Sequence, residues 1–137
     1  MGGFEVVEHT ADVGIRAHGA SLEAAFEQTT LGLIEITGAR GTSGEGKRVP
    51  LDVEAQDLAG LLVEWLGEIV YLQDARDAVI ADVRVDRVEP KRASGSVTLM
   101  PRGDVILEGT AVKAITYHQV KVERSGERWT TQVYVDV

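Results

Sequence analysis

The segment His9–Ile15 (HTADVGI) places an imidazole, a hydroxyl and a carboxylate within four residues. Polar groups clustered between apolar runs usually serve a site, and His9 and Asp12 are the ionisable members of this cluster. Apolar residues alternate at Phe4–Val7 and again at Val13–Ala17, which predicts an N-terminal β-hairpin with the cluster at its turn. Asp12 also has a purely structural interpretation, because aspartate often stabilises a turn by bonding to the backbone.

A second cluster, Lys113–His118 (KAITYH), places a lysine, two hydroxyls and an imidazole in a predicted strand. Alternation predicts Lys113 and Tyr117 on one face and His118 on the other. A structural interpretation stays open, with Tyr117 half buried and His118 satisfied by a backbone hydrogen bond. No neighbouring serine or second acid completes a hydrolase triad.

The end of the chain carries two carboxylates, on the side chain of Asp136 and at the terminus of Val137. Such a pair of hard oxygen ligands suits Ca²⁺ or Mg²⁺ if a third acid approaches. Chain ends are commonly frayed. The apolar residues Val133, Val135 and Val137 argue against fraying here, because they continue the strand pattern to the last residue.

The run 41–47 (GTSGEGK) matches the first seven positions of a phosphate-binding P-loop. That loop requires a preceding strand, a following helix and a hydroxyl after the lysine. Here a helix is predicted before the run, Arg48 follows Lys47, and Pro50 begins a strand. We therefore interpret the glycine-rich segment as a mobile surface loop.

The composition excludes several classes of site and partner. Without cysteine, there are no disulfides, thiolate metal sites or cysteine nucleophiles. The formal net charge of −8 disfavours strong direct binding to nucleic acid. No segment approaches the roughly 18 apolar residues of a membrane span, and the N-terminus resembles no export signal, so we expect a cytoplasmic protein without a membrane partner.

The hydrophobic pattern predicts one α+β domain, residues 1–137, with two helices packed on one face of a mainly antiparallel sheet. The first helix is expected at Ser21–Ile36, and Asp57 is expected to cap a second, which carries Trp65 in a broad apolar stripe. After the N-terminal hairpin, the expected strands are Val49–Val53, Val79–Val88, Ser96–Val105, Ala114–Glu123 and Trp129–Val135. Pro50 favours a sheet edge for the first of these, and the later strands read as a meander.

The chain resembles the archease family over nearly its whole length. The resemblance is carried by the two clusters and the terminal Asp136-Val137, which occur in this order, and by the helix after the first strand pair. The family has the same length. Proline often precedes the terminal aspartate in the family, whereas Val135 stands there in this chain. Gln119 is a second position at which the chain is not assumed to be equivalent.

The resemblance implies a non-catalytic protein that activates an RtcB-type RNA ligase during tRNA splicing and RNA repair. Archeases are thought to promote guanylylation of the ligase and to restore stalled ligase. The resemblance assigns a metal site to Asp12, Asp136 and Val137, with Ca²⁺ as the expected ion and Mg²⁺ or Mn²⁺ as alternatives. His9, Lys113, Tyr117 and His118 are then expected to support the site or to face the partner.

Two other functions stay open at this point. One is a small metal-dependent hydrolase that uses Asp12 and His118. The other is a general chaperone or adaptor that acts through the helix bearing Trp65 or through an exposed sheet edge. The metal hypothesis requires the two ends of the chain to meet in space.

Overall fold

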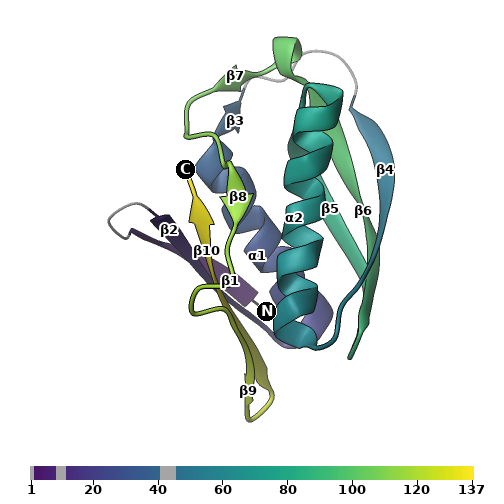
Figure 1. Ribbon diagram of the computed structural model, residues 1–137, viewed down its shortest axis with the longest axis vertical. Helices are drawn as coiled ribbons and strands as arrows, with labels where there is room; N and C mark the ends of the chain where they lie inside the picture. The colour runs from purple at the N-terminus through teal and green to yellow at the C-terminus, as the bar shows by residue number, and fades with distance from the viewer. Residues whose placement is uncertain (1, 9–11, 41–45) are drawn as a thin grey trace.

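Two helices lie between two antiparallel sheets in the computed structural model, which describes residues 2–8, 12–40 and 46–137 (Figure 1). The elements are β1 (Gly2–Glu8), β2 (Asp12–Gly19), α1 (Leu22–Thr37), β3 (Ala39–Arg40), β4 (Lys47–Glu54), α2 (Leu58–Arg76), β5 (Ala78–Glu89), β6 (Arg92–Pro101), the 3-10 helix η1 (Arg102–Asp104), β7 (Ile106–Leu107), β8 (Ala114–Ile115), β9 (Lys121–Ser125) and β10 (Arg128–Asp136). The predicted α+β class, with two helices on antiparallel sheets, is confirmed.

The described strands form two larger sheets and one short pair, β3 with β7. One sheet has the order β1-β2-β10-β8, with β9 also paired to β10, and the other has the order β4-β6-β5. Both helices contact strands of both sheets. The prediction of one sheet covered on one face was therefore too simple, and the later strands do not form one meander, because β5 and β6 belong to one sheet and β8 to β10 to the other.

Helix α1 begins and ends where the sequence favours a cap. The Ser21 hydroxyl accepts a hydrogen bond from the Ala24 amide at 3.0 Å. Gly38 follows the helix in the left-handed region, with a φ of 66°, and a Cβ there would lie 2.5 Å from the amide nitrogen of Gly109. Only glycine fits this tight approach.

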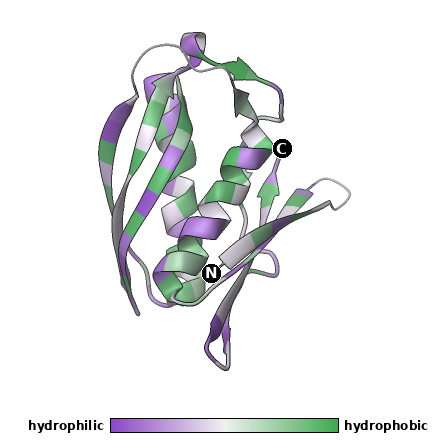
Figure 2. Cartoon of the chain, turned by 180° about the vertical axis from the view of Figure 1, so that it is seen from behind, coloured by the Kyte–Doolittle hydropathy of each residue, from purple (hydrophilic) through white to green (hydrophobic). Residues whose placement is uncertain are grey.

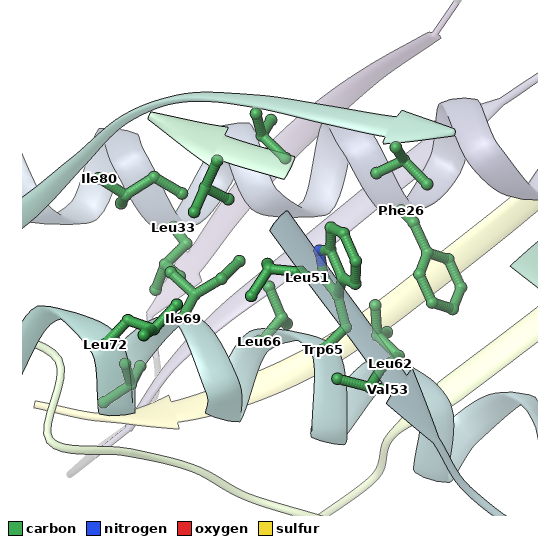
Figure 3. Close-up of a cluster of buried hydrophobic side chains, with 14 of the residues drawn as sticks. Phe26, Leu33, Leu51, Val53, Leu62, Trp65, Leu66, Ile69, Leu72 and Ile80 are labelled. Atoms are coloured by element: carbon green, nitrogen blue, oxygen red, sulfur yellow. The ribbon is translucent and has the colours of Figure 1, made fainter. Parts of the chain in front are cut away.

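Helix α2 provides much of the core. Asp57 caps it by accepting a hydrogen bond from the Gly60 amide at 2.7 Å, as predicted. Trp65 is fully buried, and its indole nitrogen donates to the Thr30 hydroxyl of α1 at 3.1 Å. Figure 3 shows this residue among apolar side chains such as Leu62, and it therefore offers no surface for a chaperone or adaptor contact.

The free edge of β5 is covered by two acceptor side chains of helix α1. Glu23 and Glu27 of α1 accept hydrogen bonds from the amides of Val88 and Val85, at 2.8 and 3.0 Å. Because an uncovered edge can pair with a strand of another chain, these contacts protect the sheet as well as join it to α1.

Several predicted boundaries are confirmed and others are wrong. The strand around Val49–Val53 is an edge strand, and Figure 2 shows the alternating hydropathy of its residues as bands of colour along the strand at the left. Strand β6 ends at Pro101, where η1 begins, and not at Val105. The strand predicted for Ala114–Glu123 is interrupted, since only β8 and β9 at its two ends are paired.

Residues Ala39 and Arg40, which directly precede the glycine-rich run, form β3 and pair with β7. Residues 41–45 lie outside the described part, so the prediction of a mobile loop there is not tested. Strand β4 begins at Lys47, the last residue of the P-loop-like run. A phosphate-binding loop requires a helix at this place, so the structure agrees with the rejection of that motif. Among the described helices, none combines the length and hydrophobicity needed to cross a membrane.

Candidate metal centre

The strand pair β2 and β10 brings the two ends of the chain together. The antiparallel register runs from Trp129 opposite Gly19 to Asp136 opposite Asp12. The inward-facing Ile15 fixes this register, because a slip of one residue would turn its buried side chain outward. The sequence-based condition for the metal hypothesis, that Asp12 and Asp136 lie close together, is therefore met.

The two carboxyl groups of this pair lie on the outer face of the sheet and interact directly. A hydrogen bond with Asp12 raises the pKa of Asp136 above its ordinary value, and partial burial and the negative charge of Asp12 act in the same direction. The ammonium group of Lys113 opposes these effects and lowers the same pKa. Two carboxylates so placed disfavour full ionisation unless a cation lies between them or nearby.

Strand β8 anchors the end of β10. The amide of Lys113 donates to the carbonyl oxygen of Asp136 at 2.8 Å, and Ala114 lies opposite Asp136 in the ladder. Val137, partly buried, packs against the hydrophobic core. These contacts hold the last residues beside Asp12, so the terminal segment is part of the sheet rather than a frayed end.

The donors placed here fit a hard divalent cation only in part. Within residues 2–8, 12–40 and 46–137, no group of three or more His, Cys, Asp or Glu side chains is placed to hold a metal. The carboxylates of Asp12 and Asp136 therefore need further oxygen ligands, for which the terminal carboxylate of Val137 stays a prediction. His9 lies outside the described residues.

The second predicted cluster adopts a turn rather than a continuous strand. The Thr116 hydroxyl donates to the carbonyl oxygen of Tyr134 at 2.9 Å, and Gln119 has a φ of 50°. Tyr117 is 61% exposed, so the prediction of a half-buried ring is wrong. The regular alternation of faces predicted for this segment also ends at the turn, because residues 116–120 no longer follow a strand.

The turn brings His118 near β10, the strand that carries Asp136. Its ring lies 5.8 Å from the ring of Tyr134, centroid to centroid, and its amide donates to the Thr116 hydroxyl at 3.3 Å. Tyr134 is buried and precedes Asp136 by two residues on the same face. No described contact joins His118 to Asp12, the pair required by the hydrolase hypothesis.

Sequence reasoning missed the residues that share this face of the sheet. Arg16 and His18 follow Asp12 at even spacing on β2, and Gln132 and Tyr134 precede Asp136 at even spacing on β10. The period of two along a strand was a signal that could have found them. It could not have shown that β2 and β10 are neighbours.

The fold defines a class of small α+β proteins in which helices lie between antiparallel sheets. In this chain a carboxylate pair forms where the two ends meet. Two solved structures share the fold: protein 1598 of Methanobacterium thermoautotrophicum (TM-score 0.72, 24% identity, 98% of this chain and 99% of that one) and an archease of Thermotoga maritima described as a possible chaperone (TM-score 0.69, 24% identity, 96% and 94%).

Sequence comparison identifies the family within this class. The family model described as "Archease protein family (MTH1598/TM1083)" matches residues 4–137. The chain is 36% identical to the protein archease of Thermococcus kodakarensis and 35% identical to that of Pyrococcus furiosus, with 98% of each chain covered. The chain therefore belongs to the archease family.

Proposed function

We propose that this protein is a non-catalytic activator of an RtcB-type RNA ligase, and that its activity depends on a divalent cation held by Asp12, Asp136 and the terminal carboxylate of Val137. The observation that carries the proposal is the pairing of Asp12 with Asp136 across β2 and β10 in a chain of the archease family. The family resemblance suggests the ligase as partner, and the strand register supports the metal proposal because it places two of the three proposed ligands side by side.

Calcium is the proposed ion, because carboxylate oxygens are hard ligands and Ca²⁺ accepts irregular sets of oxygen ligands completed by water. The raised pKa of Asp136 supports a cation at this place, because like charges in contact are stabilised by a positive ion. When bound, the ion would supply local positive charge at the proposed contact with the ligase. The ammonium group of Lys113 is proposed to balance part of the negative charge when the ion is absent.

The overall charge suits an activator that binds a protein rather than RNA. With a formal net charge of −8, the domain is repelled by phosphate backbones and attracted to a basic surface such as the nucleic-acid cleft of a ligase. The exposed ring of Tyr117 and the neighbouring His118 lie on the turn next to the proposed metal centre. We place the ligase contact there, and the protein in the cytoplasm with its partner.

The test is multiple-turnover RNA ligation by the partner ligase, with GTP and a divalent metal, in the presence of each variant. We expect Asp12→Ala and Asp136→Ala to abolish activation while circular dichroism shows the native fold. Asp52→Ala is the matched control, because Asp52 is also a carboxylate on a strand but lies in the other sheet, bound to Arg92. It should activate the ligase as the unchanged protein does.

Full activation by both metal-site variants would disprove the proposal. A general chaperone would protect unrelated proteins from aggregation equally well with or without calcium, and a hydrolase would cleave ester or phosphate substrates in a reaction lost in His118→Ala. Either result, together with no effect on ligation, would show that the protein is a chaperone or a hydrolase and not an activator of the ligase.

A further inference from the structure

A hollow of about 520 Å³ lies on the outer face of the larger sheet, lined by residues of β1, β2, β9 and β10. Figure 1 shows these strands together in one sheet, across the helices from β4, β5 and β6. The volume is within the range of sites for small molecules. The hollow is separate from the carboxylate pair, because neither Asp12 nor Asp136 is among its lining residues.

Positive groups from three strands converge on this hollow because of the strand register. Arg16, Gln132 and Lys121 lie in one row across β2, β10 and β9. Arg128 and the imidazole of His18 line the same hollow. In a chain with a formal net charge of −8, this is a local concentration of cationic and hydrogen-bond-donating side chains.

One of these cations is held in position by a chain of hydrogen bonds. Gln132, which is only 9% exposed, donates through Nε2 to the carbonyl oxygen of Gln119 at 2.8 Å. Its Oε1 accepts a hydrogen bond from Nε of Arg16 at 2.9 Å. The guanidinium is thereby oriented by a buried amide, and its two terminal nitrogens remain as donors.

Two further cations have no partner within the described part of the chain. Neither Lys121 nor Arg128 forms a side-chain hydrogen bond or an ion pair with a residue in 2–8, 12–40 or 46–137. Arg16 lies 3.8 Å from a carboxylate oxygen of Glu5, with both side chains more than half exposed, so this ion pair is weak. The positive charge in the hollow is therefore largely uncompensated by the protein.

Acidic side chains limit which anion fits. Glu5 and Glu123 also line the hollow, on β1 and β9. They repel an extended polyanion that crosses the sheet, but they can accept hydrogen bonds from hydroxyl or amino groups. The complementary ligand has one phosphate group for the cations and neutral donors for the two glutamates.

We propose that this hollow binds a phosphate monoester of the size of a nucleoside monophosphate or a sugar phosphate, with its phosphate held by Arg16, Lys121 and Arg128. The site does not depend on the proposed ligase activation or on the metal. Inorganic phosphate shares the recognised group but lacks the donors for Glu5 and Glu123, and it therefore binds more weakly.

The test is titration of the full chain with inorganic phosphate, glucose 6-phosphate and adenosine 5′-monophosphate, followed by amide chemical shifts in nuclear magnetic resonance spectra. We expect saturable shifts at Lys121, Thr130 and Gln132, with at least one of the two monoesters binding more tightly than inorganic phosphate. Failure of all three ligands to saturate these shifts would overturn the proposal, and so would binding of a single-stranded RNA in preference to all of them.

Charge variants separate a built site from general attraction. Lys121→Gln and Arg128→Gln should each weaken binding about tenfold, the effect of one charge-assisted hydrogen bond. Glu123→Gln should strengthen the binding of inorganic phosphate, because it removes a repulsive charge. Arg124→Gln is the matched control: it removes one positive charge from β9, but Arg124 lies over the Trp129 ring outside the hollow.

An equal loss in Arg124→Gln and Lys121→Gln would show nonspecific attraction and overturn the proposal. Asp12→Asn and Asp136→Asn distinguish this site from the metal centre, because both variants should bind the monoesters normally. If they lost binding, the phosphate would lie at the carboxylate pair and the assignment to the hollow would be wrong. Thermal unfolding of each variant verifies that the fold is retained.

Discussion

Acidic side chains lie across neighbouring strands in both of the larger sheets, but their partners differ. In the β4-β6-β5 sheet, Asp52 receives two hydrogen bonds from the guanidinium of Arg92, one of them 2.9 Å long. This contact holds the pKa of Asp52 below its ordinary value. In the other sheet Asp136 faces Asp12, and its pKa is raised instead.

The difference separates structural acids from an acid pair that stability alone does not explain. Glu23 and Glu27 also have a structural partner, since each accepts a hydrogen bond from an amide of β5. Like charges directly opposite on adjacent strands are destabilising. A pair such as Asp12 and Asp136 is therefore expected where a cation, rather than another side chain, completes the contact.

The strongest test of this contrast is calcium-dependent stability. Calcium should raise the melting temperature of the unchanged protein, because a ligand that binds only the folded state stabilises it. Asp12→Asn and Asp136→Asn should each weaken calcium affinity roughly 100-fold, since ligand charge sets affinity at such sites. Calorimetric titration and thermal unfolding with calcium or with a chelator measure both effects.

The effect of these substitutions on the melting temperature should change sign when the metal is removed. In chelator, Asp136→Asn is expected to raise the melting temperature, because it relieves the repulsion from Asp12. The control Asp52→Asn should lower it slightly in both conditions, since it weakens an exposed ion pair. A metal-site variant that is less stable in chelator and unaffected by calcium would contradict the contrast between the two sheets.

A smaller effect is expected from the acids that cover the edge of β5. Glu27→Ala should lower the free energy of unfolding by about 1–2 kcal/mol, because it removes a charged acceptor from the amide of Val85. Glu27→Gln keeps an acceptor oxygen and should lose less. Chemical denaturation measures both variants, and an equal loss would show that negative charge, rather than hydrogen bonding, is what β5 requires.

Local patterns predicted the helices better than the sheets. The caps at Ser21 and Asp57 and the apolar spacing after them depend on neighbouring residues, so they are visible in the sequence. The division into two sheets depends on which strands pair across many residues. The segment Ala114–Glu123 alternated like one strand, but a turn at Gln119 divides it and leads the chain over Tyr134.

The sequence could predict the candidate metal centre only on the condition that Asp12 and Asp136 lie close together. Asp12 and Asp136 were chosen by residue type and family resemblance, and their proximity followed once β2 and β10 proved to be neighbours. The raised pKa of Asp136 could not be predicted, because it arises from a contact between residues at opposite ends of the chain. The orientation of Arg16 by Gln132 was missed for the same reason.

The smallest expected effect is the response of the two acids to pH in the metal-free protein. Because the pKa of Asp52 is lower in the folded state, its contribution to stability is present above its unfolded pKa and is lost as pH falls through the folded value. The sign is opposite for Asp136, whose raised pKa makes the folded state less stable as pH rises from the unfolded to the folded value. Carboxyl carbon shifts in nuclear magnetic resonance spectra should show Asp52 titrating at a lower pH than Asp136. Arg92→Gln should move the titration of Asp52 upward and leave Asp136 unchanged, and the reverse order of titration would mean that the two contacts do not differ as described.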